Sequence, residues 1–477
     1  MCKAMAITWS TRYGSGSIEM RRFCCVAFFL LCVAPASFSQ SVGEVADPPP
    51  SAQTEDARFD PIAATDAYLA RVPDEKRARS DAYFEGGYWL QLWDFLLGLG
   101  IAWLLLGTGL SAGIRDRVER WTSFRWLQTL LYAIAYILIT ALLTFPMTLY
   151  QGFFREHQYQ LSNQTLGAWL KDALIGLTVG LVLGGLGLVV LYEVLRRAPR
   201  TWWIWGTVVS IVFLLFLSLI FPVFIAPLFN TYTPLKDSAL RDKILSLARA
   251  NGIPAQDVYQ VDASRQSKRV SANVSGLAGT LRISLNDNLL NRCSSEEIQE
   301  VMGHEMGHYA LNHVYEGLLS GGLATLLGFA FVRWAFQRVL ARFGSGWGIR
   351  GVADIAGLPL LLALLSIFSF VLTPLDNTFT RTNEAEADLF ALNASRQPDG
   401  AAEVALKLGE YRKLSPGPLE EWILFDHPSG RSRILMAMRW KAEHLWELPP
   451  PPPPPPPPSP PPPRAHPPPT PHNPPLE

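Results

Sequence analysis

The sequence has few charged residues, no net charge and almost no cysteine outside its first 32 positions. Only 17% of its 477 residues are charged, whereas about a quarter is usual in a soluble domain. Lysine plus arginine equals aspartate plus glutamate at 41 each, so nothing in the charge balance points to a nucleic-acid partner. Four of the five cysteines lie within residues 1–32, and Cys293 stands alone in the rest of the chain. This distribution excludes a disulfide framework and a cysteine zinc site.

Long apolar runs are abundant instead. Hydrophobic residues make up 49% of the chain, and six runs reach or exceed the roughly 20 residues that a helix needs to cross a bilayer core. Because soluble helices seldom run so long without charge, we expect a multi-pass, mainly α-helical protein in contact with membrane lipid. The predicted spans are Tyr88–Ile114, Trp126–Tyr150, Ala173–Leu195, Thr201–Phe229, Gly317–Phe336 and Asp354–Leu375.

The segments outside the spans differ in composition. Residues 1–40 begin with a basic stretch, continue into a short apolar core and end in small residues, which is typical of a signal peptide; a short first membrane helix is the alternative. Residues 41–87 are predicted to form a polar leader. The spans occupy 88–230 and 317–376, which leaves two polar segments, 231–316 and 377–448. Residues 449–477 are nearly all proline and predict an extended, solvated tail, either a spacer or a ligand for a proline-binding domain.

The first polar segment contains a metal-binding pattern. His304, Glu305 and His308 form H-E-x-x-H within a predicted helix, which Ser294 and Glu297 start with a capping box. Histidines four residues apart project from one helical face and can bind zinc, with Glu305 beside them to transfer protons. The alternative is a chance match on an amphipathic helix. This helix is expected to continue straight into the fifth span, which would hold the metal near the membrane surface.

A catalytic zinc usually has three protein ligands, so a third must come from elsewhere. Glu384 and Asp388 are four residues apart on one helical face, so one can ligate while the other orients a ligand histidine. Glu386 points about 200° around the helix from Glu384. His313 and Glu300 are nearer in sequence, but His313 falls off the ligand face and is interpreted as structural.

Two further groups of residues bear on catalysis. His427 and Arg433 lie in the polar stretch 425–434 and could donate hydrogen bonds to the oxyanion of a peptidase reaction; otherwise they belong to a helix-start turn. Short strands are predicted at Val258–Val261, Ala272–Ser275 and Leu281–Leu285, after a helix at Lys236–Ala250.

These motifs resemble the CAAX prenyl protease 1 type of integral-membrane zinc metalloprotease, the type I CAAX endopeptidases. The resemblance runs from about Trp126 to Arg433, with the motifs in the same order. Its catalytic part is H-E-x-x-H at 304–308, E-x-x-x-D at 384–388 and H-P-x-x-x-x-R at 427–433. It implies a barrel of transmembrane helices that encloses a chamber, with a gluzincin-like zinc site and a small sheet.

The resemblance also implies roles for single residues. One catalytic zinc ion would be held by His304, His308 and Glu384, with Glu305 as general base. Asp388 would orient a ligand histidine, and His427 and Arg433 would hold the scissile carbonyl of the substrate. A peptide substrate would lie extended on an edge strand at Ser271–Leu277. Asn273 matches the family there, whereas Ser271 and Ser275 replace a histidine and a tyrosine that many relatives carry.

The predicted function is therefore peptide-bond hydrolysis by a membrane-embedded zinc endopeptidase. Specificity for prenylated substrates rests on the resemblance alone. One alternative is quality control of membrane or secreted proteins. Another is a non-catalytic scaffold with a structural zinc, which would normally close all four metal positions with protein ligands.

Arginine-rich loops predict the orientation in the membrane. Such loops stay on the cytoplasmic side, and alternate loops share a side. The catalytic segments follow the fourth and sixth spans, so they are expected on the opposite face, which is the periplasmic side of a bacterial inner membrane. The resemblance implies the cytosol for eukaryotic relatives. After the first, third and fifth spans the loops carry Arg115, Arg117, Arg120 and Arg125; Arg196, Arg197 and Arg200; and Arg338, Arg342 and Arg350.

Overall fold

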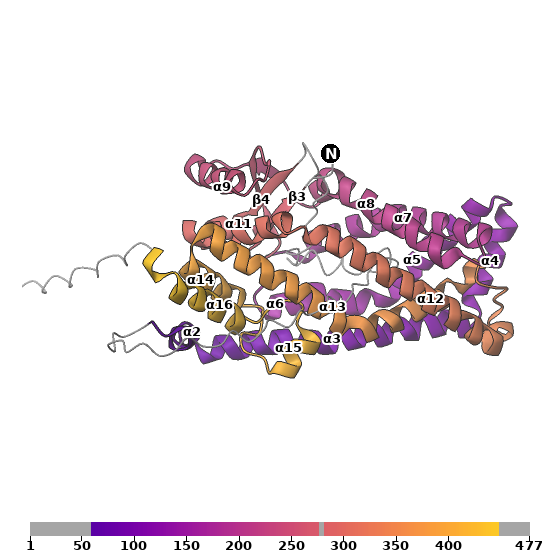
Figure 1. Ribbon diagram of the computed structural model, residues 1–477. Coiled ribbons are helices and arrows are strands. Elements are labelled where there is room, and N and C mark those ends of the chain that lie inside the picture. Colours follow the sequence, from indigo (N-terminus) through magenta and orange to yellow (C-terminus); the bar gives the residue numbers. More distant parts are fainter. Residues whose placement is uncertain (1–58, 276–280, 448–477) are drawn as a thin grey trace, which may run out of the picture. The chain divides into compact units, whose positions relative to one another are not determined.

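The computed structural model describes residues 59–275 and 281–447, most of which are helical (Figure 1). One compact unit extends to Glu443. The predicted signal peptide at 1–40 and the proline tail lie outside the described residues. The longer helices are α2 (Pro61–Ala70), α3 (Asp74–Gly107), α4 (Leu110–Trp121), α5 (Arg125–Leu149), α7 (Leu166–Arg197), α8 (Trp202–Ile220), α9 (Ser238–Ala250), α11 (Ser295–Ala310), α12 (His313–Trp347), α13 (Leu358–Ser395), α14 (Pro398–Leu408) and α16 (Gly430–Glu443); the short ones are α6 (Arg155–Gln158), α10 (Asp287–Arg292) and α15 (Pro418–Leu424).

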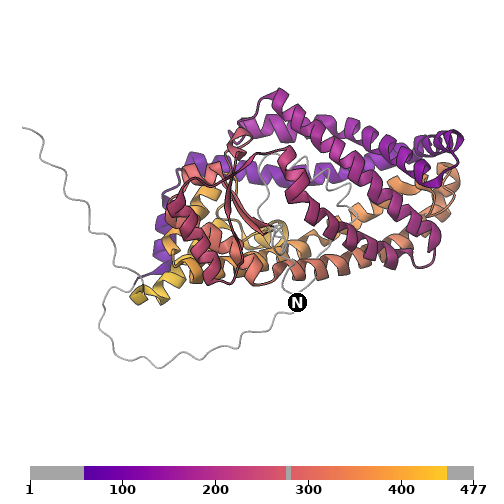
Figure 2. The same cartoon turned by 90° about the horizontal axis from the view of Figure 1, so that it is seen from above.

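Six of these helices are long and apolar enough to cross a membrane, as the sequence predicts. They are α3, α5, α7, α8, α12 and α13, and they run alongside one another (Figures 1 and 2). A shared core of large apolar side chains, including Tyr192, Trp202, Phe329 and Phe336, fills the space where α5, α7, α8, α12 and α13 meet. The mainly α-helical membrane fold is confirmed; the enclosed chamber that the resemblance implies stays a prediction.

The first span differs from its expected bounds. Its helix starts at Asp74, inside the predicted leader, and stops at Gly107. Gly109 adopts φ +71°, a left-handed conformation that glycine adopts easily, and α4 then starts as a separate helix. α2 also lies in the predicted leader, where Tyr68 and Arg71 bond to Asp399 and Glu403 of α14. These partners lie about 330 positions along the chain, so local sequence does not reveal them.

The helix with the H-E-x-x-H pattern does not continue into the fifth span, so that expectation is wrong. α11 ends at Ala310, Asn312 takes φ +63°, and α12 begins at His313. Asparagine is among the few side chains that tolerate this conformation, which explains why the chain turns there. The predicted capping box at Ser294 and Glu297 is present at the start of α11.

A four-stranded sheet, in the order β1-β2-β4-β3, packs against α11. Its strands are β1 (Tyr232–Pro234), β2 (Val258–Val261), β3 (Ala272–Ser275) and β4 (Arg282–Asn286). β2 and β4 are parallel, whereas β1 and β3 are antiparallel to their neighbours. The three predicted strands are present; β1, with three residues and a proline, was not expected. Met302 and Met306 of α11 are fully buried in the core under this sheet, which fixes the rotation of α11 about its axis.

α11 and α13 approach each other closely through small residues. A Cβ added at Gly303 would lie 3.1 Å from Cα of Ala391, and one at Gly307 would lie 3.2 Å from Cα of Ala387. Such close contact between two backbones requires glycine on one side and a small residue on the other. This interface sets the spacing between the helix that carries His304 and the helix that carries Glu384.

Candidate metal centre

Three side chains that the sequence singles out as ligands meet between α11 and α13. His304, His308 and Glu384 are buried, and their donor atoms lie within 4.8 Å of one another. The two histidine Nε2 atoms are 3.2 Å apart, and the carboxylate oxygens of Glu384 lie 3.3 Å from Nε2 of His304 and 3.4 Å from Nε2 of His308. In a tetrahedral zinc site with bonds of about 2.0–2.1 Å, ligand atoms are separated by about 3.3 Å. The donor set therefore fits a zinc ion.

The carboxylate of Glu384 supplies a second sign of a metal site. Glu384 is 1% exposed, and its Oε1 atom has no hydrogen-bond partner among the described residues. A buried carboxylate oxygen without a donor is costly unless a cation satisfies it. Oε1 faces Nε2 of His308, where an ion between the two would bind both atoms.

Each histidine is held from its other ring nitrogen. Nδ1 of His304 lies 2.8 Å from a carboxylate oxygen of Asp388, as the sequence predicts for one of the two acids on this face. Nδ1 of His308 lies 2.9 Å from Nδ1 of His313, whose Nε2 atom lies 3.2 Å from Glu386. Such partners orient a metal-binding imidazole. The sequence predicts a structural role for His313, because a count of helical positions through residue 312 turns it away from His308; the break between α11 and α12 brings it beside His308 instead.

The two histidines differ in protonation. Burial lowers the pKa of His308, which favours the neutral ring that a metal ligand needs. Burial also acts to lower the pKa of His304, but the negative charges of Glu384 and Asp388 outweigh it and raise this pKa to about 10. A cation that binds at His304 would therefore displace a proton.

Arg433 and His427 reach the same place from the C-terminal segment. Nη2 of Arg433 donates to Oε2 of Glu384 at 3.0 Å, and its Nε atom lies 3.2 Å from Asp388. Nε2 of His427 lies 3.4 Å from Oε2 of Glu384 and has no hydrogen bond to a described residue, while its Nδ1 atom lies 2.8 Å from Asp426. The structure thus brings both predicted donors to the site.

Glu305 is fully buried in α11, between His304 and the sheet-facing Met306. Glu300, one turn earlier, accepts a hydrogen bond from Ser395 instead of joining the donor set. Burial raises the pKa of Glu300 to about 8. Glu300 is therefore not brought to the metal position, and Glu386 reaches it only through His313.

Membrane-spanning helices that also position an H-E-x-x-H metal site are characteristic of membrane-embedded metallopeptidases, and fold and site together assign this chain to that class. Sequence comparison narrows the assignment. The chain belongs to peptidase family M48, whose profile matches residues 234–441. A second profile, described as CAAX prenyl protease N-terminal, five membrane helices, matches residues 64–231. The predicted family and the metalloendopeptidase activity are thereby confirmed.

Relatives cover most of the chain. An uncharacterized metalloprotease of Bacillus subtilis, YhfN, is 34% identical over 346 residues, which are 71% of this chain and 81% of the relative. CAAX prenyl protease 1 of Saccharomyces cerevisiae is 28% identical over 62% of this chain and 69% of its own length. The crystal structure of Ste24p from S. mikatae has the same fold, with a TM-score of 0.67 at 22% identity over 89% of this chain and 97% of that chain.

Proposed function

We propose that this protein is a zinc-dependent endopeptidase in which His304, His308 and Glu384 hold one zinc ion. The observation that carries the proposal is the buried donor cluster: the Nε2 atoms of His304 and His308 are 3.2 Å apart, and they lie 3.3 Å from Oε2 and 3.4 Å from Oε1 of Glu384, separations close to those in a tetrahedral zinc site. A zinc ion in such a site supplies Lewis acidity, which makes a water molecule a good nucleophile near neutral pH. A non-catalytic scaffold would bury the carboxylate of Glu305 without using it as a base, so the burial of Glu305 favours the enzyme.

Glu305 is proposed as the general base. It takes a proton from the attacking water and then delivers it to the leaving amine of the substrate. Its position in the H-E-x-x-H pattern of α11 supports this role, and its complete burial keeps bulk water from competing for the proton. Asp388 is proposed to keep His304 in the orientation that binds the metal.

His427 and Arg433 are proposed to act on the scissile carbonyl, His427 mainly as a hydrogen-bond donor and Arg433 mainly through its charge. Nε2 of His427 is buried beside Glu384 without a hydrogen bond to a described residue, so it is available to donate when the ring is protonated. Arg433 forms ion pairs with Glu384 and Asp388. Its first effect is therefore to balance the charge of these two carboxylates, and a contact with substrate adds to that.

The substrate is proposed to bind as an extended strand along β3. β3 ends the sheet opposite to β1 and packs near α11, so a peptide added beside it would pass the metal site. Asn273, which pairs with Ser284 of β4, lies within this strand, whereas Gly276 and Leu277 lie outside the described residues. The curated relatives named CAAX prenyl protease 1 support a prenylated substrate, and quality-control proteolysis is the alternative.

The catalytic side is proposed to be the periplasmic face of a bacterial inner membrane. The ends of α7 and α12 and the segment from α4 to α5 bring Arg196, Arg350, Arg115 and Arg125 to one cavity, so the three arginine-rich loops share one membrane face. α11 precedes α12, and Glu384 lies near the far end of α13, so the metal site is at the opposite face. Alkaline phosphatase fused after Leu448 should be active and green fluorescent protein dark; the reverse pattern would place catalysis in the cytoplasm.

Glu305→Gln tests the catalytic proposal. This change keeps size and hydrogen bonding but removes the base, so turnover should fall by roughly 10²–10⁴-fold while zinc stays bound. Glu296 is an exposed acid on the same helix, so Glu296→Gln is the matched control and should keep both normal turnover and bound zinc. Zinc content and peptide cleavage are measured on the same purified samples. Near-normal turnover of Glu305→Gln with zinc bound would contradict the mechanism and favour a scaffold.

A further inference from the structure

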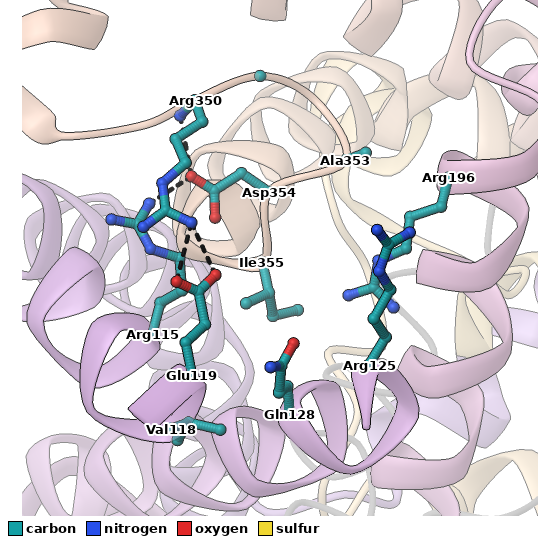
Figure 3. Close-up of a pocket in the computed structure, with 11 residues that line it drawn as sticks. Arg115, Val118, Glu119, Arg125, Gln128, Arg196, Arg350, Ala353, Asp354 and Ile355 are labelled. Carbon is teal, nitrogen blue, oxygen red and sulfur yellow. Dashed lines mark hydrogen bonds and ion pairs between the residues drawn. The ribbon is translucent and has the colours of Figure 1, made fainter. Parts of the chain in front are cut away.

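An arginine-lined cavity lies at the end of the helix bundle away from the metal site. It encloses about 300 Å³ and is lined by residues from α4, α5, α7 and the connection between α12 and α13 (Figure 3). Roughly 40 Å along α13 separates Leu358, next to this cavity, from Glu384, at 1.5 Å per residue. The cavity therefore has no part in the peptidase site.

The positive charges in this cavity are only partly balanced. Arg115 pairs with Asp354 at 2.5 Å, and Arg350 pairs with Glu119 at 2.7 Å. Arg125 and Arg196 line the cavity as well, and Figure 3 shows both projecting into it from the side opposite those pairs. A third acid, Asp116, also pairs with Arg115 at 2.7 Å and with Arg350 at 3.0 Å. The excess of positive charge therefore lies at Arg125 and Arg196, and it favours an anion there.

Arg196 lacks a strong acidic partner. Its Nη2 atom donates to Thr129 at 2.7 Å, its Nη1 atom is buried without a hydrogen bond to a described residue, and Glu193 approaches Nη1 only to 3.9 Å. No ion pair joins Arg125 to an acid within the parts of the chain that the structure describes. Guanidinium groups bind phosphate oxygens through paired hydrogen bonds, so these two side chains suit a phosphate group.

A second, apolar groove continues from the same place. It holds about 810 Å³ and is lined by Val189, Val190, Val194, Trp205 and Val209 of α7 and α8, and it shares Arg125 with the arginine-lined cavity. Two neighbouring side chains on its rim, Phe124 and Trp126, are 64% and 54% exposed. Exposed aromatic residues at the ends of membrane spans lie at the level of lipid headgroups.

We propose that this composite site binds one anionic phospholipid, with its phosphate between Arg125 and Arg196 and an acyl chain in the apolar groove. A basic pocket at a span end accounts for the headgroup, and the adjoining groove accounts for a tail that a soluble phosphate lacks. The bound lipid would bridge α5, α7 and α8 at the face opposite the metal site.

Native mass spectrometry of the full chain, released from vesicles of equal parts phosphatidylglycerol and phosphatidylcholine, tests this site. The wild type should retain phosphatidylglycerol preferentially. Arg125→Gln with Arg196→Gln should reduce that retention by at least about tenfold, since each arginine near anionic lipid contributes roughly a factor of five. Arg117→Gln with Arg200→Gln removes the same charge from exposed positions on the same face and should change retention little.

Two further arms separate the possible sources of phosphate. Val190→Trp should narrow the groove and lower phosphatidylglycerol retention without removing a charge, and millimolar inorganic phosphate should not displace the lipid. If both double variants lost phosphatidylglycerol to the same extent, general attraction to the charged surface would explain the retention, and the proposed site would be refuted. Displacement by inorganic phosphate with no effect of Val190→Trp would show a soluble-anion site instead. Normal zinc content and cleavage in every variant verify that each one folds.

Discussion

The close approach of α11 and α13 makes a sharp prediction about metal affinity. Alanine at Gly307 would place its Cβ atom 3.2 Å from Cα of Ala387 and 3.2 Å from Cβ of Phe390, and alanine at Gly303 would meet Cα of Ala391 at 3.1 Å. Carbon atoms in contact prefer about 3.5–4.0 Å, so the two helices must separate by roughly 0.3–0.9 Å. The atoms that have to give are mostly backbone, which cannot rotate away.

The expected magnitude follows from two opposing effects. Alanine is favoured over glycine within a helix by about 1 kcal/mol, whereas overpacking costs about 1–3 kcal/mol, so net stability changes little. Metal affinity is more sensitive, because ligand distances tolerate shifts of only about 0.2 Å. Moving α11 away from Glu384 should therefore weaken zinc binding by at least about tenfold, which corresponds to about 1.4 kcal/mol.

Zinc competition against a fluorescent chelator measures this loss, and peptide cleavage at saturating zinc shows whether activity returns. Gly317→Ala is the matched control: this helical glycine of α12 has no atom within 4 Å of an added Cβ, so the change should leave affinity untouched. If Gly303→Ala and Gly307→Ala bound zinc as tightly as Gly317→Ala, the glycine interface would not set the ligand spacing.

Three other changes test separate parts of the site. Glu384→Ala should lose most of the zinc, whereas Glu386→Ala should keep it, because Glu386 is half exposed and reaches the site only through His313; metal analysis that gave the opposite order would overturn the ligand assignment. His427→Ala should lower kcat by roughly 10²–10³-fold with zinc retained; a change in KM alone would indicate ordinary substrate binding. In metal-free protein, Glu300 holds a proton between pH 4.5 and about 8 that the unfolded chain lacks. Stability should therefore fall as pH rises through this window, by at most about 1.4 kcal/mol per pH unit, and thermal melts of Glu300→Gln should lack that slope.

Much of the fold and of the donor set was predictable because it depends on local periodicity. Six apolar runs specify six long helices, and spacing of four residues brings His304 and His308 onto one face. The pairing of Glu384 with these histidines came from the spacing to Asp388 together with the family resemblance. The structure places all three in one buried cluster, and their roles remain predictions.

The remaining features depend on contacts between distant segments. The break at Asn312 reorients His313 toward His308, and a count of helical positions through that break gives the wrong direction. The sequence predicts only a polar leader at 41–87, because the partner of Arg71 is Glu403 of α14, far along the chain. The need for glycine at 303 and 307 comes from Ala387 and Ala391 of α13, which lie 80 or more positions further along the chain and give no local signal.

The length of α13 beyond its membrane-spanning stretch sets the height of the proposed metal position above the bilayer. Its uncharged stretch ends at Leu375, and Glu384 follows Asp376 by eight positions, so the proposed metal position stands at most about 12 Å beyond that point along the helix axis. A substrate anchored in the same bilayer spans this height with about four extended residues. The place of the cut would then be selected by distance from the anchor, and side-chain sequence would only refine it.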